Sequence, residues 1–455
     1  MSNSLFNEFE PVSAKQWKQI IQFDLKGADY NDALVWTSSE GIKVKPFYHS
    51  DDLNTPLKLS ETPISSFKIC ETLTVFNAKK ANASALLAVK KGAESIRFII
   101  PSKDIDFKKL LANINFKTIT LYFELQFLSE DSIKSICAIT SKVNTFINID
   151  IIGHLAKTGN WYSNLNDDFS KFKTCTLYSN SLTINASLYQ NAGANMVQQL
   201  AYAIAHVNEY FNAIETTHTS ISSQINIVFN VAIGTNYFFE IAKLRALRVL
   251  FNTLKKEYST DYKCIIFATP STRNKALYAY NTNMLRTTTE CMSAVLGSAD
   301  TISNLPYDTV FNKPNDFACR IARNQLLILK HESYFDVVKN PSDGSYYIES
   351  LTQQLANKAL DIFKDIETNG GFLKQLKSGT IQRKIKESAT KEQEQFNAGN
   401  KVILGSNKHP NTSETMKSNL EIYPFVKTKK RKTLIEPIIE KRLTEHLEQK
   451  RLKTE

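Results

Sequence analysis

Two hydrophobic patterns alternate along most of the chain. Short, nearly continuous apolar runs are separated by longer stretches in which apolar residues recur every three to four positions. The runs are typical of strands buried on both faces, and the longer stretches are typical of amphipathic helices. The predicted strands are residues 96–100, 119–123, 146–152, 175–178, 182–185, 225–229 and 264–268. The predicted helices are residues 81–90, 106–111, 131–142, 195–211 and 236–255.

This order of elements predicts a parallel sheet covered by helices. The number of strand–helix units, seven or eight, favours closure into an α/β (β/α)₈ TIM barrel. An open doubly wound sheet is the alternative. Against it, no Gly-x-Gly-x-x-Gly follows the first strand and no Gly-x-x-x-x-Gly-Lys-Ser/Thr occurs in the chain, so neither nucleotide-phosphate signature is present.

Further elements flank the predicted barrel. A helix is expected over residues 11–26, an extended segment over 36–48, helices over 346–366 and 372–396, a short strand over 401–405 and a last amphipathic helix over 434–447. We therefore expect an N-terminal helix and arm in residues 1–60, the barrel in 61–405, and a linker with a terminal helix in 406–455. An arm without a core of its own is expected to pack on something else.

Composition excludes several classes of protein. With 42% apolar and 22% charged residues, the chain is expected to be globular. It has no apolar run of membrane-spanning length and no basic-then-apolar leader at Met1–Glu10, so we expect a cytoplasmic protein that does not enter the membrane. The 6 cysteines are widely spaced and include no Cys-x-x-Cys pair, which indicates buried free thiols in a reducing compartment.

A net charge of +11 raises the hypothesis of a nucleic-acid binder. The basic residues are scattered among acids, except for one short run at 427–432. A solvated loop explains that run, so we expect no nucleic-acid partner.

The C-terminal ends of barrel strands normally carry the active site. The residues after the predicted strands include no pair of carboxylates and no nucleophile beside a base. His154 is the one imidazole in such a position, and a structural role is expected for it. His206 is predicted to project from the opposite face of its helix to the apolar stripe, where a solvent or packing role is favoured.

Four arginines and a glutamate stand out between residues 234 and 308. They are Arg245, Arg248, Arg273, Arg286 and Glu290. Arg286 and Glu290 are four residues apart on one helix, a spacing that favours a local ion pair. For the arginines, a structural ion-pair network between barrel helices is favoured over an anion site for a phosphate or a CoA pantetheine arm.

Several motifs in this sequence resemble the methylmalonyl-CoA mutase family, and within it the small, beta-type subunits. They are Trp36 to Tyr48, Gln190-Asn191-Ala192-Gly193-Ala194, Phe239 to Arg248, Asn283 to Glu290, Arg320-Ile321-Ala322-Arg323-Asn324 and Asn340 to Glu349. Together they cover nearly the whole chain in family order. The resemblance implies a CoA-type (β/α)₈ barrel. It also implies a heterodimer whose large subunit interconverts methylmalonyl-CoA and succinyl-CoA by adenosylcobalamin radical chemistry.

The departures from the family pattern concern its catalytic residues. The family's Tyr-His pair before the Gln-x-Ala-Gly-Ala element aligns with Ser187 and Leu188, and its catalytic tyrosine aligns with Thr72. Leucine can neither donate a hydrogen bond nor shuttle a proton. The family's Asp-x-His-x-x-Gly cobalt-ligand motif would follow the last helix, but this chain has no such motif and ends at Glu455. We therefore expect no catalytic residues and no cobalamin-binding domain.

Two hypotheses of function remain. In the first, the chain is the non-catalytic small subunit of a heterodimeric mutase, binds no cofactor itself and supports a large subunit that holds adenosylcobalamin. In the alternative, it is an acyl-CoA-binding barrel enzyme with its own unrecognised activity. The substitution at Leu188 and the missing motif favour the first.

Overall fold

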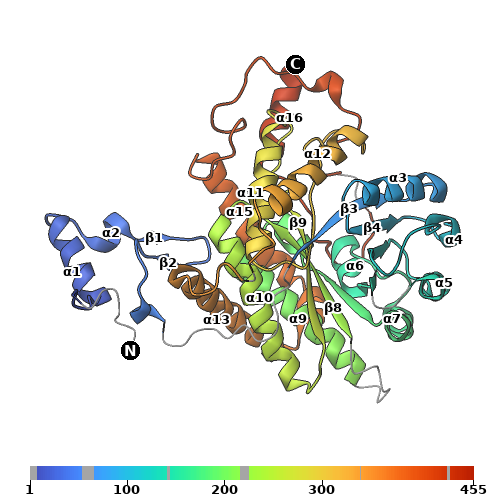
Figure 1. The fold of residues 1–455 in the computed structure, drawn as a ribbon, viewed down its shortest axis with the longest axis horizontal. Coiled ribbons are helices and arrows are strands. Elements are labelled where there is room, and N and C mark those ends of the chain that lie inside the picture. Colours follow the sequence, from blue (N-terminus) through green and yellow to red (C-terminus); the bar gives the residue numbers. More distant parts are fainter. Residues whose placement is uncertain (1–7, 54–65, 141–143, 216–224, 339, 428–430) are drawn as a thin grey trace.

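Eight parallel strands form a nearly closed barrel at the centre of the chain (Figure 1). The computed structural model describes residues 8–53, 66–140, 144–215, 225–338, 340–427 and 431–455. The hydrogen-bonded order is β6-β5-β4-β3-β10-β9-β8-β7. The strands are β3 (Lys68–Thr74), β4 (Ser95–Ile100), β5 (Thr120–Leu125), β6 (Thr145–Asn148), β7 (Ser181–Asn185), β8 (Asn226–Ile233), β9 (Lys263–Pro270) and β10 (Thr301–Ser303). The predicted TIM barrel is thus confirmed.

Side chains join β6 to β7, the two end strands of the sheet. The backbone N–H of Ile147 donates to Ser181 Oγ (3.1 Å), and the same hydroxyl lies 3.3 Å from the Ile147 carbonyl oxygen. Thr183 donates to Asn148 Oδ1 (3.0 Å). These bonds use polar groups that an open sheet would leave exposed at its edges. The alternative of an open doubly wound sheet is therefore wrong.

Helices cover the outside of the barrel (Figure 1). They are α3 (Ala78–Lys90), α4 (Phe107–Leu110), α5 (Glu130–Ile139), α6 (Ile151–Thr158), α7 (Leu165–Ser179), α8 (Ser187–Asn191), α9 (Met196–Glu215), α10 (Tyr237–Glu257), α11 (Thr282–Leu296) and α12 (Asp316–Leu327). A π-helix follows α12 at Ile328–Glu332. Beyond it, α13 (Tyr346–Thr368) packs on α9 and α10 as an outer layer. No helix in the described ranges has the length and hydrophobicity that crossing a bilayer requires.

The predicted strand at residues 175–178 is wrong, because this segment belongs to α7. Asn164 caps that helix by accepting from the Asp167 N–H (3.0 Å), and the helix ends at Asn180, whose φ is +48°. Phe172, Cys175 and Ser179 are buried at helical spacing along it. The apolar run was therefore one face of a helix.

Three predictions in the C-terminal third also need correction. The expected helix over 372–396 is divided into α14 (Phe372–Lys377) and α15 (Thr380–Asn397) by Gly379, whose φ is +77°. Residues 401–405 form an irregular segment with one isolated bridge, from Leu404 to Lys408, in place of a strand. The expected helix over 434–447 begins only at α16 (Glu445–Thr454).

Residues 431–443 run as an irregular strap along the C-terminal side of the barrel. Its backbone N–H groups donate to carbonyls of the barrel domain: Ile438 to Ala156 in α6 (2.7 Å) and Leu443 to Arg273 after β9 (2.9 Å). Pro437, in the middle of the expected helix, has no N–H to donate and would clash with the preceding turn. The backbone N–H groups of the strap therefore bond to the barrel domain and not to carbonyls of a helix of their own.

The N-terminal arm contacts the rest of the chain through its hairpin and the segment after it, and leaves its first helix exposed. It consists of α1 (Ala14–Asp24), α2 (Tyr30–Leu34), the antiparallel pair β1 (Trp36–Thr37) and β2 (Lys43–Val44), and a 3₁₀ turn at Ser50–Asp52. Ile42, at the hairpin tip, is fully buried in the main core, whereas α1 has no buried residue. The expected domain boundary at residue 61 lies outside the described residues, as do residues 428–430 of the basic run. The division into domains stays a prediction.

Candidate functional site

Aromatic side chains fill the barrel lumen. The ring centroid of Tyr122 lies 5.1 Å from that of Phe146 and 4.7 Å from that of Phe267. These residues come from β5, β6 and β9, and β5 and β9 are not neighbours in the sheet, so the rings meet in the interior. The Tyr122 hydroxyl lies 2.8 Å from Thr301 Oγ1, across the lumen. We call Tyr122, Phe146 and Phe267 the aromatic plug, because at this level they leave a packed core and no open channel.

A cavity of about 310 Å³ lies at the C-terminal ends of β5 to β8, and we call it the mouth cavity. Alternate residues along a strand face the same side, so Glu124, Asn148 and Asn230 stand one layer above Tyr122, Phe146 and Val228. The plug therefore closes the inner end of this cavity. Its lining consists of Glu124, Leu125, Gln126, Asn148, Asp150, Gly153, His154, Lys157, Thr158, Tyr162, Thr183, Asn185 and Asn230.

Asp150 is the most heavily bonded residue of the mouth cavity. Its carboxylate accepts from the backbone N–H groups of Asn185 (2.7 Å) and Gly153 (2.8 Å) and from the hydroxyl of Tyr210 (2.8 Å). His206 Nε2 lies 3.0 Å away. Burial alone would raise the pKa of Asp150, but His206 and the backbone donors outweigh it and lower that pKa. The carboxylate is therefore ionised near neutral pH.

His206 is fully buried, with Nδ1 2.9 Å from the Tyr189 hydroxyl. Both sides of α9 are covered, because the helix packs against α10, α13 and α14 as well as the barrel. We expected either a solvent-exposed or a packing role for His206. The side chain is a packing residue and is not exposed to solvent. The Asp150–His206–Tyr189 chain ties the end of β6 to α8 and α9.

His154 makes a packing contact of the kind expected for a structural role. Its ring stacks on Tyr162 with centroids 3.6 Å apart and an interplanar angle of 14°. Burial lowers the pKa of His154 to about 4, and the charges of Arg431 and Lys157 act in the same direction. The imidazole is therefore neutral near pH 7.

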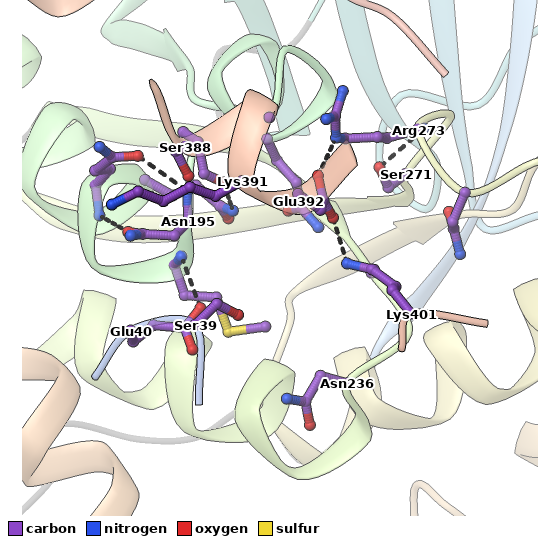
Figure 2. A pocket seen from close by; sticks show the side chains of 18 of the residues that line it. Ser39, Glu40, Asn195, Asn236, Ser271, Arg273, Ser388, Lys391, Glu392 and Lys401 are labelled. Atoms are coloured by element: carbon purple, nitrogen blue, oxygen red, sulfur yellow. Dashed lines mark hydrogen bonds and ion pairs between the residues drawn. The ribbon is translucent and has the colours of Figure 1, made fainter. Parts of the chain in front are cut away.

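A second cavity, of about 400 Å³, lies at the C-terminal ends of β7, β8 and β9, and we call it the rim cavity. Figure 2 shows Ser39 and Glu40 from the tip of the arm on one side and Lys391 and Glu392 of α15 on another. Most of its charges are already paired: Glu392 with Lys401, and Lys384 with Glu387. No group of three or more metal-ligating side chains occurs among the residues that the structure describes.

Arg273 is the one predicted arginine that lines a cavity. Its Nε donates to Glu392 (2.5 Å) and its Nη1 donates to the carbonyl of Lys441 in the strap (2.8 Å), as Figure 2 shows for the first contact. Gly193 packs against it with φ of +102°, and a Cβ there would lie 2.8 Å from Arg273 Nη2. This close approach explains the glycine of the Gln190–Ala194 motif.

Arg245 and Arg248 lie in structural ion pairs. Arg245 contacts Asp343 and Glu349, which links α10 to the start of α13. Arg248 donates to Asp300 Oδ2 (2.7 Å) and to the Ser298 carbonyl (2.6 Å), next to β10. Neither residue lines the mouth or rim cavity. Their contacts agree with a structural ion-pair network.

The expected ion pair between Arg286 and Glu290 is replaced by other contacts. Glu290 is buried and faces Lys275, whose Nζ lies 2.8 and 3.0 Å from the two carboxylate oxygens. Arg286 donates to Asn283 Oδ1 (2.7 Å) and to the Leu404 carbonyl (2.5 Å). Glu290 is buried and Arg286 is partly buried, and the ion pair of the glutamate is made with the interior lysine.

Leu188 and Thr72 stand apart from both cavities. Leu188 is 1% exposed and belongs to the main hydrophobic core. Thr72 Oγ1 lies 2.7 Å from Ser303 Oγ, so this pair bridges β3 and β10 inside the barrel. Neither lines the mouth or rim cavity.

Comparison with known proteins shows what this barrel is similar to. The model of the family described as "Methylmalonyl-CoA mutase" matches residues 103–453. A methylmalonyl-CoA mutase small subunit from Porphyromonas gingivalis is 32% identical, over 90% of this chain and 72% of that protein. The small subunit from Streptomyces virginiae is 24% identical, over the same shares. The P. gingivalis large subunit is 33% identical, over 53% of this chain and 35% of that protein. By this match, the chain belongs to the methylmalonyl-CoA mutase family.

Proposed function

We propose that this chain is the non-catalytic small subunit of a heterodimeric methylmalonyl-CoA mutase. Relatives named as small subunits align over 90% of the chain, whereas the P. gingivalis large subunit aligns over 53%. The proposal rests chiefly on one observation: the aromatic plug occupies the barrel axis, so an extended acyl-CoA chain has no path along it.

The residues at the catalytic positions support the same proposal. Leu188 holds an apolar side chain in the core where the family's histidine would stand. The Thr72 hydroxyl lies 2.7 Å from Ser303 Oγ and lines neither cavity. An enzyme of this class needs a group that can donate to the thioester carbonyl, and a leucine has none.

The buried histidine beside the barrel mouth also fits poorly with cobalamin binding. A histidine that ligates cobalt needs a free ring nitrogen directed at the metal. His206 is fully buried, and its two ring nitrogens lie 3.0 Å from Asp150 Oδ1 and 2.9 Å from the Tyr189 hydroxyl, so neither is directed at a cavity. We therefore infer that adenosylcobalamin is held by the large subunit.

The exposed face of α1 supports a role in assembly. Trp17, Ile20 and Phe23 are 47%, 59% and 84% exposed. Clustered large apolar side chains on the surface mark interaction sites. We infer that the arm contacts the large subunit.

Co-expression with a methylmalonyl-CoA mutase large subunit tests the proposal. Size-exclusion chromatography with light scattering should give a 1:1 complex that interconverts methylmalonyl-CoA and succinyl-CoA. This chain alone should show no turnover with adenosylcobalamin and no heat of binding with CoA in calorimetry. Turnover by the isolated chain, or a chain that stays monomeric beside the large subunit, would contradict the proposal.

A further inference from the structure

The mouth cavity has the features of a small-molecule site that is separate from acyl-CoA chemistry. We propose that it binds a small uncharged molecule carrying several hydroxyl groups, of the polyol class. Its volume of about 310 Å³ is at the lower end of the range for small-molecule sites, about 300–1,000 Å³. Because the aromatic plug closes its inner end, the ligand must be short.

The charged groups that line the cavity already have partners. Glu124 forms a salt bridge with Arg97, which comes from the layer below. Lys157 Nζ lies 3.3 Å from Glu440 of the strap. Asp150 accepts from two backbone N–H groups and a hydroxyl and lies beside His206. A charged ligand would therefore lose its hydration without gaining a free counter-charge.

The uncommitted hydrogen-bonding capacity of the cavity belongs to carboxamides. Asn230 is 5% exposed, and its side chain makes no hydrogen bond with any residue in the described part of the chain. Asn148 and Asn185 each accept one bond through Oδ1, from Thr183 (3.0 Å) and Ser187 (2.6 Å), which leaves their amino groups as donors. Asn230 is buried and Asn148 and Asn185 are partly buried, and all three line the cavity, so a ligand or ordered water there can satisfy their free donors and acceptors.

A hydroxyl group matches this lining because it both donates and accepts, as a carboxamide does. An apolar ligand would leave Asn230 unpaired. The His154–Tyr162 stack adds a flat, neutral wall against which the C–H face of a polyol can pack. Charge, hydrogen bonding and size thus select the same ligand class.

Saturation-transfer NMR on the full-length chain with xylitol, glycerol and myo-inositol tests this inference. We expect a saturable signal from at least one of them, with a Kd in the millimolar range. Asn230→Leu keeps the volume but removes the carboxamide, and we expect it to weaken binding about tenfold or more. Ser388→Ala in the rim cavity is the matched control and should leave the titration unchanged. Succinate, a small dianion, should not displace the polyol.

Three results would overturn the inference. They are the absence of a saturable signal up to about 100 mM for all three polyols, equal binding by Asn230→Leu, and displacement by succinate. If circular dichroism shows that Asn230→Leu is unfolded, Asn185→Leu in the same cavity gives the same test. Because the titration uses this chain alone, its outcome does not depend on pairing with a large subunit.

Discussion

Arg245 on α10 and Glu349 on α13 form a buried ion pair, with 2.5 Å between Nη2 and Oε1. The side chains are 1% and 6% exposed, so neither charge can turn to water if the other is removed. Asp343 contacts the same guanidinium from the loop before α13. This pair fixes the outer helical layer to the barrel.

Arg245→Met should destabilise the chain by about 3–5 kcal/mol, because it leaves the Glu349 carboxylate buried without a cation. Urea unfolding followed by circular dichroism measures the change. The double variant Arg245→Met/Glu349→Leu should recover much of the loss, since no buried charge then remains uncompensated and the Asp343 side chain, 44% exposed, is solvated. Arg383→Ala breaks a surface pair with Glu387 (3.5 Å) and should cost less than about 1 kcal/mol. Equal losses for Arg245→Met and Arg383→Ala would contradict this account.

Asp150→Asn should destabilise the protein by about 3 kcal/mol at pH 7, because the amide cannot replace the charge beside His206. The pKa of Asp150 is lowered in the folded state, so its contribution is present above the ordinary aspartate pKa of about 3.9. That contribution is lost as the pH falls through the lower, folded pKa. The difference between wild type and Asp150→Asn should therefore narrow below about pH 4.

Urea midpoints measured between about pH 3 and pH 7 give that difference directly. Asp361→Asn, at an exposed position on α13, controls for the loss of one negative charge and should follow wild type at every pH. A difference that stays constant down to the lowest pH would show that the charge of Asp150 contributes nothing.

The barrel was predictable because most of its strands are apolar on both faces. Two strands were not predicted, because their sequences are not continuous apolar runs. β3 alternates with polar residues, since Glu71 pairs with Arg323 of α12 and Thr72 faces Ser303 inside the barrel. β10 has only three residues. From the sequence alone, neither segment can be distinguished from a loop.

The candidate cavities were beyond prediction because they depend on contacts distant in sequence. Asp150 falls inside the predicted strand 146–152, but the strand ends at Asn148 and Asp150 instead caps α6. Its partners His206 and Tyr210 lie on α9, far away in the sequence. The i, i+4 spacing predicted an ion pair between Arg286 and Glu290, but Glu290 forms its salt bridge with the buried Lys275. The strap could have been anticipated from Pro437, which rules out an uninterrupted helix over 434–447.

Phe146→Ala should cost about 3–5 kcal/mol if the aromatic plug is a packed core. The ring is 7% exposed and stacks on Tyr122, so its removal leaves a cavity that the rigid strands cannot close. Phe76→Ala removes the same group at a position 81% exposed and should change stability by less than about 0.5 kcal/mol. Thermal unfolding of the two variants compares them. A small effect at Phe146 would indicate an open, solvated lumen.

Gly193→Ala should destabilise the chain more than Gly344→Ala. Both glycines have positive φ, +102° and +78°, and each substitution carries a backbone cost of about 1 kcal/mol. At Gly193 the new Cβ would also lie 2.5 Å from the Cβ of Ala389 and 2.8 Å from Arg273 Nη2, whereas at Gly344 nothing lies within 4 Å. Denaturant midpoints should rank Gly344→Ala between wild type and Gly193→Ala. The reverse order would contradict the close packing of α15 on this motif.

Phe23→Ser in α1 should weaken assembly with the large subunit by at least tenfold while leaving the unfolding midpoint of the isolated chain unchanged. Phe23 is 84% exposed and α1 has no buried residue, so the ring contributes little to the fold of this chain. Phe76→Ser, at a position 81% exposed on the barrel between β3 and α3, is the matched control and should assemble normally. Surface plasmon resonance with immobilised large subunit separates the two outcomes. Equal affinities for both variants would place the interface elsewhere than α1, because a solvent-exposed phenylalanine that binds nothing has no effect when it is removed.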